Sequence, residues 1–225
     1  MSTAFSGHSI KITLRRIARP ALALALLFCS LLLSACGGGY RILSEGAVER
    51  AVSANEYAAE EQRVFVEAAL SLVGKVHYFW GGKYYEVGPC PDWGEPREVT
   101  SPGNSTTGTV RPFGLDCSGF VTWCFCQLGC GKGCAIETIG DGTWNQWQKS
   151  VPIDRSGVVP GDLAFTNEYP SSRGNHVGVV IALDRNGDPL IAHCTSAENN
   201  VVVSTCGSSF VYFRRVSALL PAVQP

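Results

Sequence analysis

The stretch RPFGLDCSGFVTWCF, residues 111–125, places a cysteine in a setting that a structural cysteine does not need. Cys117 follows Asp116 and precedes Ser-Gly, at the head of an apolar run whose spacing predicts a helix over residues 117–128. Free backbone N–H groups and the positive end of the helix dipole favour a thiolate there. Such settings lower a cysteine pKa from about 8.5 to roughly 3.5–7.5. We therefore expect Cys117 to be a nucleophile with a lowered pKa, and Gly119 to leave space for a substrate near its sulfur.

The composition predicts one folded domain. The chain has 225 residues, a formal net charge of −1 and 45% hydrophobic residues, which is enough apolar material for one packed core. No basic patch stands out, so nucleic acid is not expected as a partner. We expect a monomer.

The first 36 residues differ from the rest of the chain. A basic segment, KITLRRIARP, precedes an apolar run of about fifteen residues, shorter than the roughly twenty needed to cross a bilayer. This order predicts a signal peptide over residues 1–35. The end of this segment, LSAC, resembles the lipobox of bacterial lipoproteins. The resemblance implies lipidation of Cys36. Residues 36–57 would then form a lipid-anchored tether and the start of a helix. The alternative is an uncleaved or conventionally cleaved signal with an incidental cysteine. In either case we expect the domain to work outside the cytoplasm.

The remaining cysteines do not define a disulfide pattern. Apart from Cys29, Cys36 and Cys117, seven of the ten remain, an odd number, so at least one stays free or pairs between chains. The seven are Cys90, Cys124, Cys126, Cys130, Cys134, Cys194 and Cys206. The four from Cys124 to Cys134 match no common zinc spacing. We expect no metal and no cofactor.

The order of predicted elements indicates an α+β domain. A helical pattern runs from about residue 44 to Gly74, and a loop rich in Pro, Gly, Ser and Thr fills residues 83–113. The helix at 117–128 and a short one at 142–148 follow. Strand patterns then occupy residues 162–167, 176–183, 189–196, 200–205 and 210–216. Helices followed by strands are typical of a mainly antiparallel sheet with helices packed on it.

A thiol nucleophile needs a base, and beyond the leader the chain holds only His77, His176 and His193. Each alone is typical of a strand or core histidine. A tight two-residue turn at Asn186-Gly187 would put His176 and His193 on one face but four residues apart, roughly 13 Å. A wider loop or a bulge that shifts the register by an even number would bring them together. A relay between them therefore requires a hairpin other than the tight one.

Five motifs in order resemble the NlpC family of bacterial cell-wall peptidases, which has a papain-like core. They are HYFWGG, LDCSGF, VVPGDLAF, HVGVVIAL and LIAHCTSAENNVVVS, and the resemblance covers about residues 58–215. It implies a cysteine peptidase domain over residues 58–218 with the nucleophile at a helix N-terminus. It also implies hydrolysis of peptidoglycan stem peptides, commonly at the bond from γ-D-glutamyl to a diamino acid. The loop at 83–113 is longer than in typical members, which leaves the bond specificity open.

The resemblance assigns roles to individual residues. Cys117 is the nucleophile, His176 the base, and His193 orients His176. Tyr78 would lie beside the sulfur, although it could be only a core aromatic. Asp116 and Ser118 would face the free amino end of the peptide, although Asp116 could be only a helix cap.

Four functions remain distinguishable. The first is the peptidase. The second keeps the same triad for an amidase or an acyl transferase, and the third is a non-catalytic wall-binding lipoprotein. The fourth is a zinc site made of Cys117, His176 and His193, which suits a cysteine before Ser-Gly less well than a nucleophile does.

Overall fold

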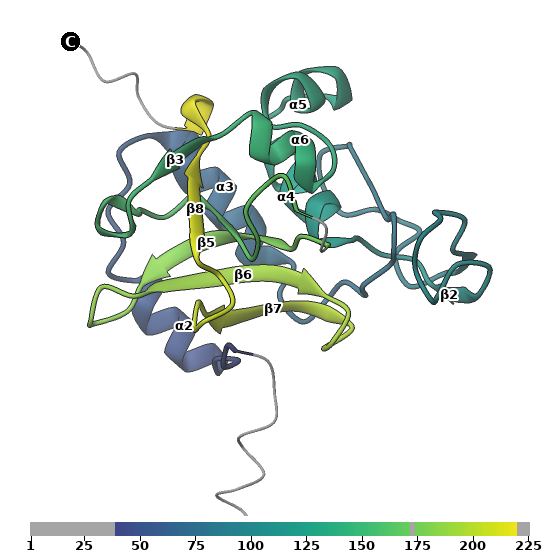
Figure 1. Cartoon of the computed structure of the whole chain (residues 1–225), viewed down its shortest axis with the longest axis horizontal. Coiled ribbons are helices and arrows are strands. Elements are labelled where there is room, and N and C mark those ends of the chain that lie inside the picture. The colour runs from purple at the N-terminus through teal and green to yellow at the C-terminus, as the bar shows by residue number, and fades with distance from the viewer. Residues whose placement is uncertain (1–38, 172–173, 220–225) are drawn as a thin grey trace, which may run out of the picture. The chain divides into compact units, whose positions relative to one another are not determined.

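A six-stranded antiparallel sheet organises the computed structural model, which describes residues 39–171 and 174–219 (Figure 1). The strand order is β3-β8-β4-β5-β6-β7. The strands are β3 (Val151–Ile153), β4 (Leu163–Phe165), β5 (Val177–Leu183), β6 (Pro189–Thr195), β7 (Asn200–Thr205) and β8 (Tyr212–Arg215). The predicted α+β class is confirmed. The predicted signal peptide and the lipidation site Cys36 lie outside the described residues.

The helices lie mostly before the sheet in the sequence. They are α2 (Glu45–Val52), α3 (Glu60–Ser71), α4 (Cys117–Cys126), α5 (Lys132–Thr138) and α6 (Thr143–Gln148), with 3-10 turns at Arg155–Gly157 and Ser217–Leu219. The single helical run expected from residue 44 to Gly74 is wrong, because the chain breaks between α2 and α3. There Asn55 Nδ2 donates to the Ile181 carbonyl of β5 at 2.8 Å, a contact that ties the break to the sheet.

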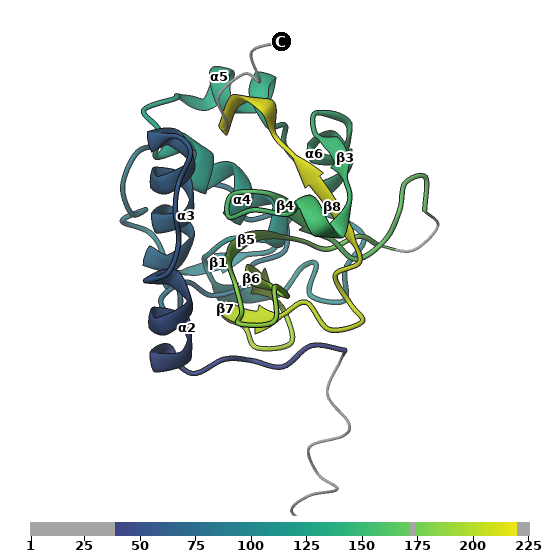
Figure 2. The same cartoon turned by 90° about the vertical axis from the view of Figure 1, so that its left-hand side faces the viewer.

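Helix α4 is the most buried helix of the described chain. All ten of its residues are buried, between α3 on one side and β5 and β6 on the other (Figure 2). Its apolar run therefore shows little helical periodicity, since core surrounds it. The helix begins at the predicted residue, and Gly129, with φ of +80°, follows its end.

The β5–β6 hairpin has the register that the two histidines need. Its turn has three residues between Asp184 and Asp188, with Gly187 at φ +82°, and a bulge between Val180 and Ala182 adds a second shift. The two one-residue shifts together move the register by two positions from the tight hairpin. An even shift keeps His176 and His193 on the same face and reduces their offset along the strands from four residues to two.

The segment 83–113 is more ordered than its sequence suggested. It contains a two-stranded hairpin of β1 (Pro96–Glu98) and β2 (Val110–Pro112), visible as a projection at the right of Figure 1. The hairpin base has its own small core of Phe79, Cys90, Val99 and Phe113. The expectation of a segment without regular structure was wrong, because three-residue strands are too short to give an alternating pattern.

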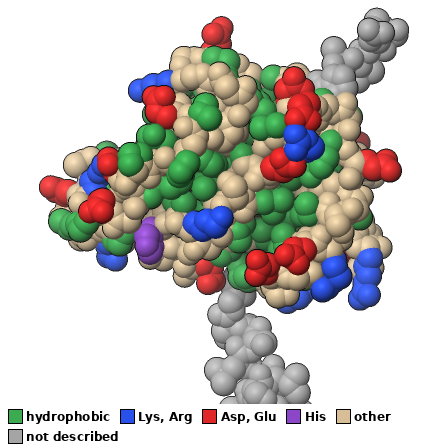
Figure 3. All heavy atoms as spheres, turned by 180° about the vertical axis from the view of Figure 1, so that it is seen from behind, with side chains coloured by type: hydrophobic (Ala, Val, Ile, Leu, Met, Phe, Trp, Pro, Cys, Tyr) green, Lys and Arg blue, Asp and Glu red, His purple; other side chains and the backbone are tan. Residues whose placement is uncertain are grey.

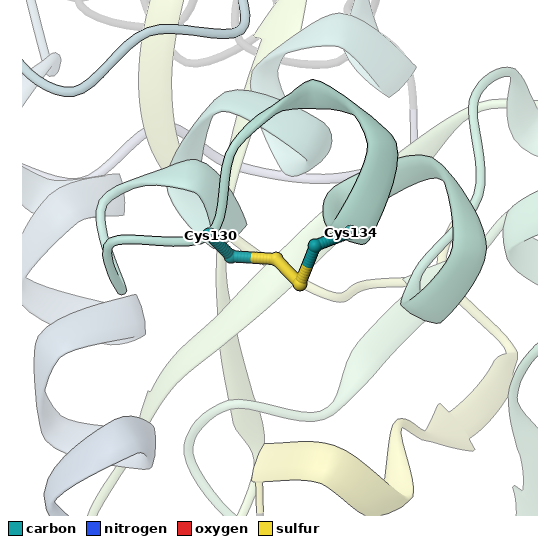
Figure 4. The surroundings of a disulfide bond; sticks show 2 residues. All are labelled: Cys130 and Cys134. Atoms are coloured by element: carbon teal, nitrogen blue, oxygen red, sulfur yellow. A yellow bond between two sulfur atoms is a disulfide. The ribbon is translucent and has the colours of Figure 1, made fainter.

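One disulfide among the described residues joins the loop after α4 to α5. It links Cys130 to Cys134 (Figure 4). The other six described cysteines are free and buried: Cys90, Cys117, Cys124, Cys126, Cys194 and Cys206. Because Cys130 and Cys134 are joined to each other, the four-cysteine zinc arrangement that was weighed at residues 124–134 is not formed.

The back of the molecule carries apolar hollows. Hydrophobic side chains gather there between acidic and basic ones (Figure 3). One hollow of about 500 Å³ lies between α2 and α3, and another of about 680 Å³ lies between α3 and the segment around Trp93. Within residues 39–171 and 174–219, no helix combines the length and the apolar character needed to cross a bilayer.

Candidate active site

Cys117 is the first residue of α4, and local contacts fix its position. Asp116 is the N-cap, and its Oδ1 accepts a hydrogen bond from the Gly119 amide at 2.6 Å. The backbone amides of Val177 and Ser118 lie within hydrogen-bonding reach of the Cys117 sulfur, where they favour its thiolate. Since Val177 is the first residue of β5 and directly follows His176, the sulfur lies at the start of that strand.

The two histidines meet in a chain of hydrogen bonds. His176 Nε2 lies 2.9 Å from His193 Nδ1, and His193 Nε2 lies 3.0 Å from Ser204 Oγ on β7. The Ser204 hydroxyl in turn donates to the Thr205 carbonyl at 3.0 Å. The bulged register of β5 and β6 therefore places His176 and His193 as diagonal neighbours on one face.

This chain of bonds assigns the protons. A carbonyl can only accept, so Ser204 donates to Thr205 and accepts from His193 Nε2–H. A neutral His193 then has a lone pair at Nδ1, which accepts from His176 Nε2–H. The remaining nitrogen of a neutral His176, Nδ1, is left with a free lone pair. The arrangement makes His176 a proton acceptor at Nδ1.

Packing holds His193 in place. Its ring is fully buried and meets the rings of Tyr40 and Phe210 edge to face, at 5.0 and 5.1 Å between centroids. Gly178 lies opposite on β5, where a Cβ would come within 2.8 Å of the Ala192 carbonyl and 3.0 Å of His193 Cβ. A side chain at residue 178 would therefore clash with Ile191, Ala192 and the Cβ that carries the His193 ring. A glycine inside a strand pattern is a known sign of such close approach.

Burial controls the charge of the site. Desolvation raises the pKa of the Cys117 thiol to about 12, and the negative charge of Asp116 adds to the shift. Desolvation lowers the pKa of His176 to about 4, and it lowers that of His193 well below its ordinary value. The expected lowered pKa of Cys117 is therefore wrong for the free protein, because its helix start is buried rather than exposed. Burial thus favours the neutral forms of the thiol and of the imidazole in the free protein.

Alkylation of the free protein tests this charge state. Because only the thiolate reacts and the pKa of Cys117 is raised, we expect iodoacetamide to modify Cys117 more slowly than free cysteine at pH 7. The rate should rise about tenfold per pH unit toward pH 12, since the thiolate fraction does so below the pKa. Mass spectrometry of the peptide containing Cys117 gives the rate. Modification faster than free cysteine at pH 7 would contradict the assignment.

The other predicted site residues lie around the same helix start. A backbone bridge aligns Tyr78 with Leu115. Burial raises the pKa of the Tyr78 hydroxyl, and the negative charge of Asp116 adds to the shift. Asp116 and Ser118 are close together, with Ser118 Oγ donating to Asp116 Oδ1 at 2.8 Å. His77, the third histidine, contacts Asn199 at 3.3 Å instead of joining the relay.

Lys83 was not anticipated at this site. Its ammonium contacts Asp116 Oδ1 and Oδ2 at 2.7 and 2.9 Å and Ser118 Oγ at 2.7 Å. Its stem and the Gly82 carbonyl lie where a side chain at residue 119 would be. Gly119 thus makes room for the chain itself, and the expectation that it admits substrate was wrong. No spacing rule links residues 83 and 116. The one sequence signal for this contact is WGGK, whose two glycines favour a turn that could bring Lys83 back against the segment around Cys117.

A hollow of about 320 Å³ adjoins Tyr78. Its walls come from the segment 78–80, the hairpin residues 104–106 and 111–112, and the turn between β6 and β7. It is smaller than the apolar hollows at the back of the molecule, but it shares Tyr78 with the surroundings of Cys117. Polar side chains and aromatic rings both line it, and Tyr78 is its link to the start of α4, since Cys117, His176 and His193 are not among its lining residues.

Comparison with known proteins identifies the family. The sequence matches the model of the NlpC/P60 family over residues 75–219, which is more than half of the chain. The protein belongs to the NlpC/P60 family. This family includes peptidoglycan hydrolases. The match begins just before Tyr78 and contains Cys117, His176, His193 and Ser204.

Several solved structures resemble this NlpC/P60 protein, and no curated protein matches it. The peptidoglycan hydrolase RipB of Mycobacterium tuberculosis is 22% identical with a TM-score of 0.49, over 87% of this chain and 80% of that one. RipD of the same organism, described as a non-catalytic peptidoglycan-binding domain, is 16% identical with a TM-score of 0.46, over 70% and 98%. A lipoprotein-like NlpC/P60 protein of Staphylococcus aureus is 18% identical with a TM-score of 0.44, over 72% and 43%.

Proposed function

We propose that the protein is a cysteine endopeptidase of the cell envelope that hydrolyses peptidoglycan stem peptides, at the bond from γ-D-glutamyl to a diamino acid. The observation that supports this most directly is the relay from His176 through His193 to Ser204, next to a capped helix that begins with Cys117. A structural histidine pair has no need for a defined tautomer. A general base beside a thiol does.

In the proposed reaction the proton and the sulfur move together. The Cys117 thiol passes its proton to Nδ1 of His176 while the sulfur attacks the scissile carbonyl carbon, and we expect these two atoms within about 4 Å. The free N–H of Cys117 at the helix start would stabilise the oxyanion. His176 then gives the proton to the leaving amine, which leaves a thioester on Cys117. Water, with its proton taken by His176, hydrolyses the thioester and restores the thiol.

We also propose that the protein is anchored outside the cytoplasm by lipid on Cys36. The basic segment, the short apolar run and the LSAC exit support this. The mature N-terminus and its mass, measured on membrane fractions, test the anchor independently of the peptidase.

Digestion of defined muropeptides tests the reaction. We expect products cut between γ-D-glutamyl and the diamino acid, identified by mass spectrometry. Cleavage of another wall amide would point to an amidase, and transfer of the acyl group to an added amine would point to a transferase. A folded protein that binds muropeptides without cutting them would identify a binding lipoprotein.

We further propose that the β1–β2 hairpin forms one wall of the substrate groove. The hairpin packs on its own small core and lines the hollow beside Tyr78, so it has the order that a wall requires. Replacing residues 100–108 by Asn-Gly should close the hairpin after Val99 and Thr109, which already pair through their backbones. We expect an altered set of muropeptide products with an unchanged melting temperature. An unchanged product set would show that the hairpin is only a solvated flap.

A further inference from the structure

Lys83 places its ammonium against Asp116 and Ser118, the two residues that flank Cys117 in the sequence. Its three N–H donors face both oxygens of Asp116 and the Ser118 hydroxyl, at 2.7 to 2.9 Å. The Asp141 carboxylate lies 3.5 Å away on the other side. One ammonium thus contacts two carboxylates and a hydroxyl, and two of these groups belong to the sequence neighbours of Cys117.

The position is enclosed. The Lys83 side chain is 20% exposed and that of Asp116 is 11% exposed. A Cβ at Gly119 would lie 3.1 Å from Lys83 Cδ, so the stem lies flat over the first turn of α4. The ammonium is therefore a fixed part of the site rather than a surface charge. Its charge also reaches the sulfur, where it favours the thiolate.

A second ammonium would be poorly accommodated here. It would have to share the oxygens of Asp116 with Lys83, at a distance where like charges repel strongly in a partly desolvated site. It could instead displace Lys83, but a tethered group competes at an effective concentration in the millimolar range. Asp141 offers little alternative, because its Oδ2 already accepts from Tyr85 and its buried Oδ1 faces Lys83.

We propose that Lys83 is a specificity-determining residue that fills the ammonium site of this protein from within. The substrate is then a peptide whose amino end is acylated, as in a stem peptide still joined to its glycan, and not a peptide with a free ammonium. The inference rests on the proposed function for its substrate class. It departs from the role that the family resemblance gave Asp116 and Ser118, because both side chains bind Lys83 here.

The test compares one synthetic stem peptide in two forms, with a free amino end and N-acetylated. Wild-type protein should cleave the acetylated form at least tenfold faster, measured as kcat/KM. Lys83→Met keeps most of the stem over Gly119 but removes the charge, and it should lower this preference at least tenfold. Lys75→Met is the matched control, because Lys75 is exposed and its ammonium bonds the carbonyl of Ser71, away from Asp116; it should leave the preference unchanged.

Calorimetry in a Cys117→Ala background makes the result independent of turnover. Adding Lys83→Met should strengthen binding of the free-amine peptide at least tenfold relative to the acetylated one. An unchanged ratio in both assays, or binding of neither peptide to either variant, would overturn the role of Lys83. If wild-type protein cleaves neither peptide, the proposed reaction fails, and the calorimetric ratio still decides the inference about Lys83.

Discussion

Replacement of Cys117 by alanine is expected to lower kcat on a cleavable muropeptide by roughly 10³-fold or more, because members of a nucleophile–base pair act as a unit. His176→Ala should have a comparable effect. The double variant should be no slower than either single variant, since each change removes the same covalent step. Product formation followed by mass spectrometry over long incubation measures the residual rate.

Cys126→Ala is the matched control for this prediction. It makes the same change on the same helix, in a residue that is also buried but lies beyond the first turn. It should retain kcat within a few-fold, and the melting temperatures of all variants should show that the fold persists. A Cys117→Ala protein with wild-type activity would exclude the proposed chemistry.

Replacement of His193 should have the second largest effect, roughly 10²-fold in kcat. His193 touches His176 rather than the substrate, so it is a positioning residue whose loss frees the His176 ring and its tautomer. The loss is smaller than for Cys117 because a water could accept the His176 Nε2–H. His193→Gln offers an amide oxygen to the same N–H and should recover part of the rate.

The pH profile separates this role from a merely structural one. In the wild type, His176 must be neutral to accept a proton, and desolvation lowers its pKa to about 4. Activity should therefore fall only as the pH drops toward 4, below the ordinary histidine range. His193→Ala admits water beside His176, so its pKa should rise and the acid limb should move upward. An acid limb that stays in place, with a rate equal to wild type, would show that His193 does not position the base.

The sequence was sufficient for the parts of the fold that follow from local patterns. The start of α4 at Cys117 and the five later strands were predicted within a few residues, because a capped helix and alternating strands leave local signals. For the contact between His176 and His193, the sequence predicted only a condition: the hairpin that joins their strands must differ from the tight two-residue one. A three-residue turn and a bulge decide that register, and the arithmetic of residue numbers admits several combinations of them.

The contacts that the sequence did not predict join segments far apart in the chain. Lys83 meets Asp116 across 33 positions, and Ser204 meets His193 from another strand. Neither pair has a spacing that periodicity can read. The pKa of Cys117 was misjudged for a related reason: the helix start was recognised, but its burial depends on tertiary packing.

The six free thiols described above have a consequence for how the protein survives outside the cytoplasm, if it is exported as we propose. Each is buried in the native state, so the folded chain keeps them from oxidants and from each other. An unfolded copy in an oxidising compartment exposes all of them at once and can form wrong disulfides faster than it refolds. The lifetime of the protein there is then set by its rate of unfolding, because burial in the native state is what limits oxidation of the free thiols, Cys117 among them.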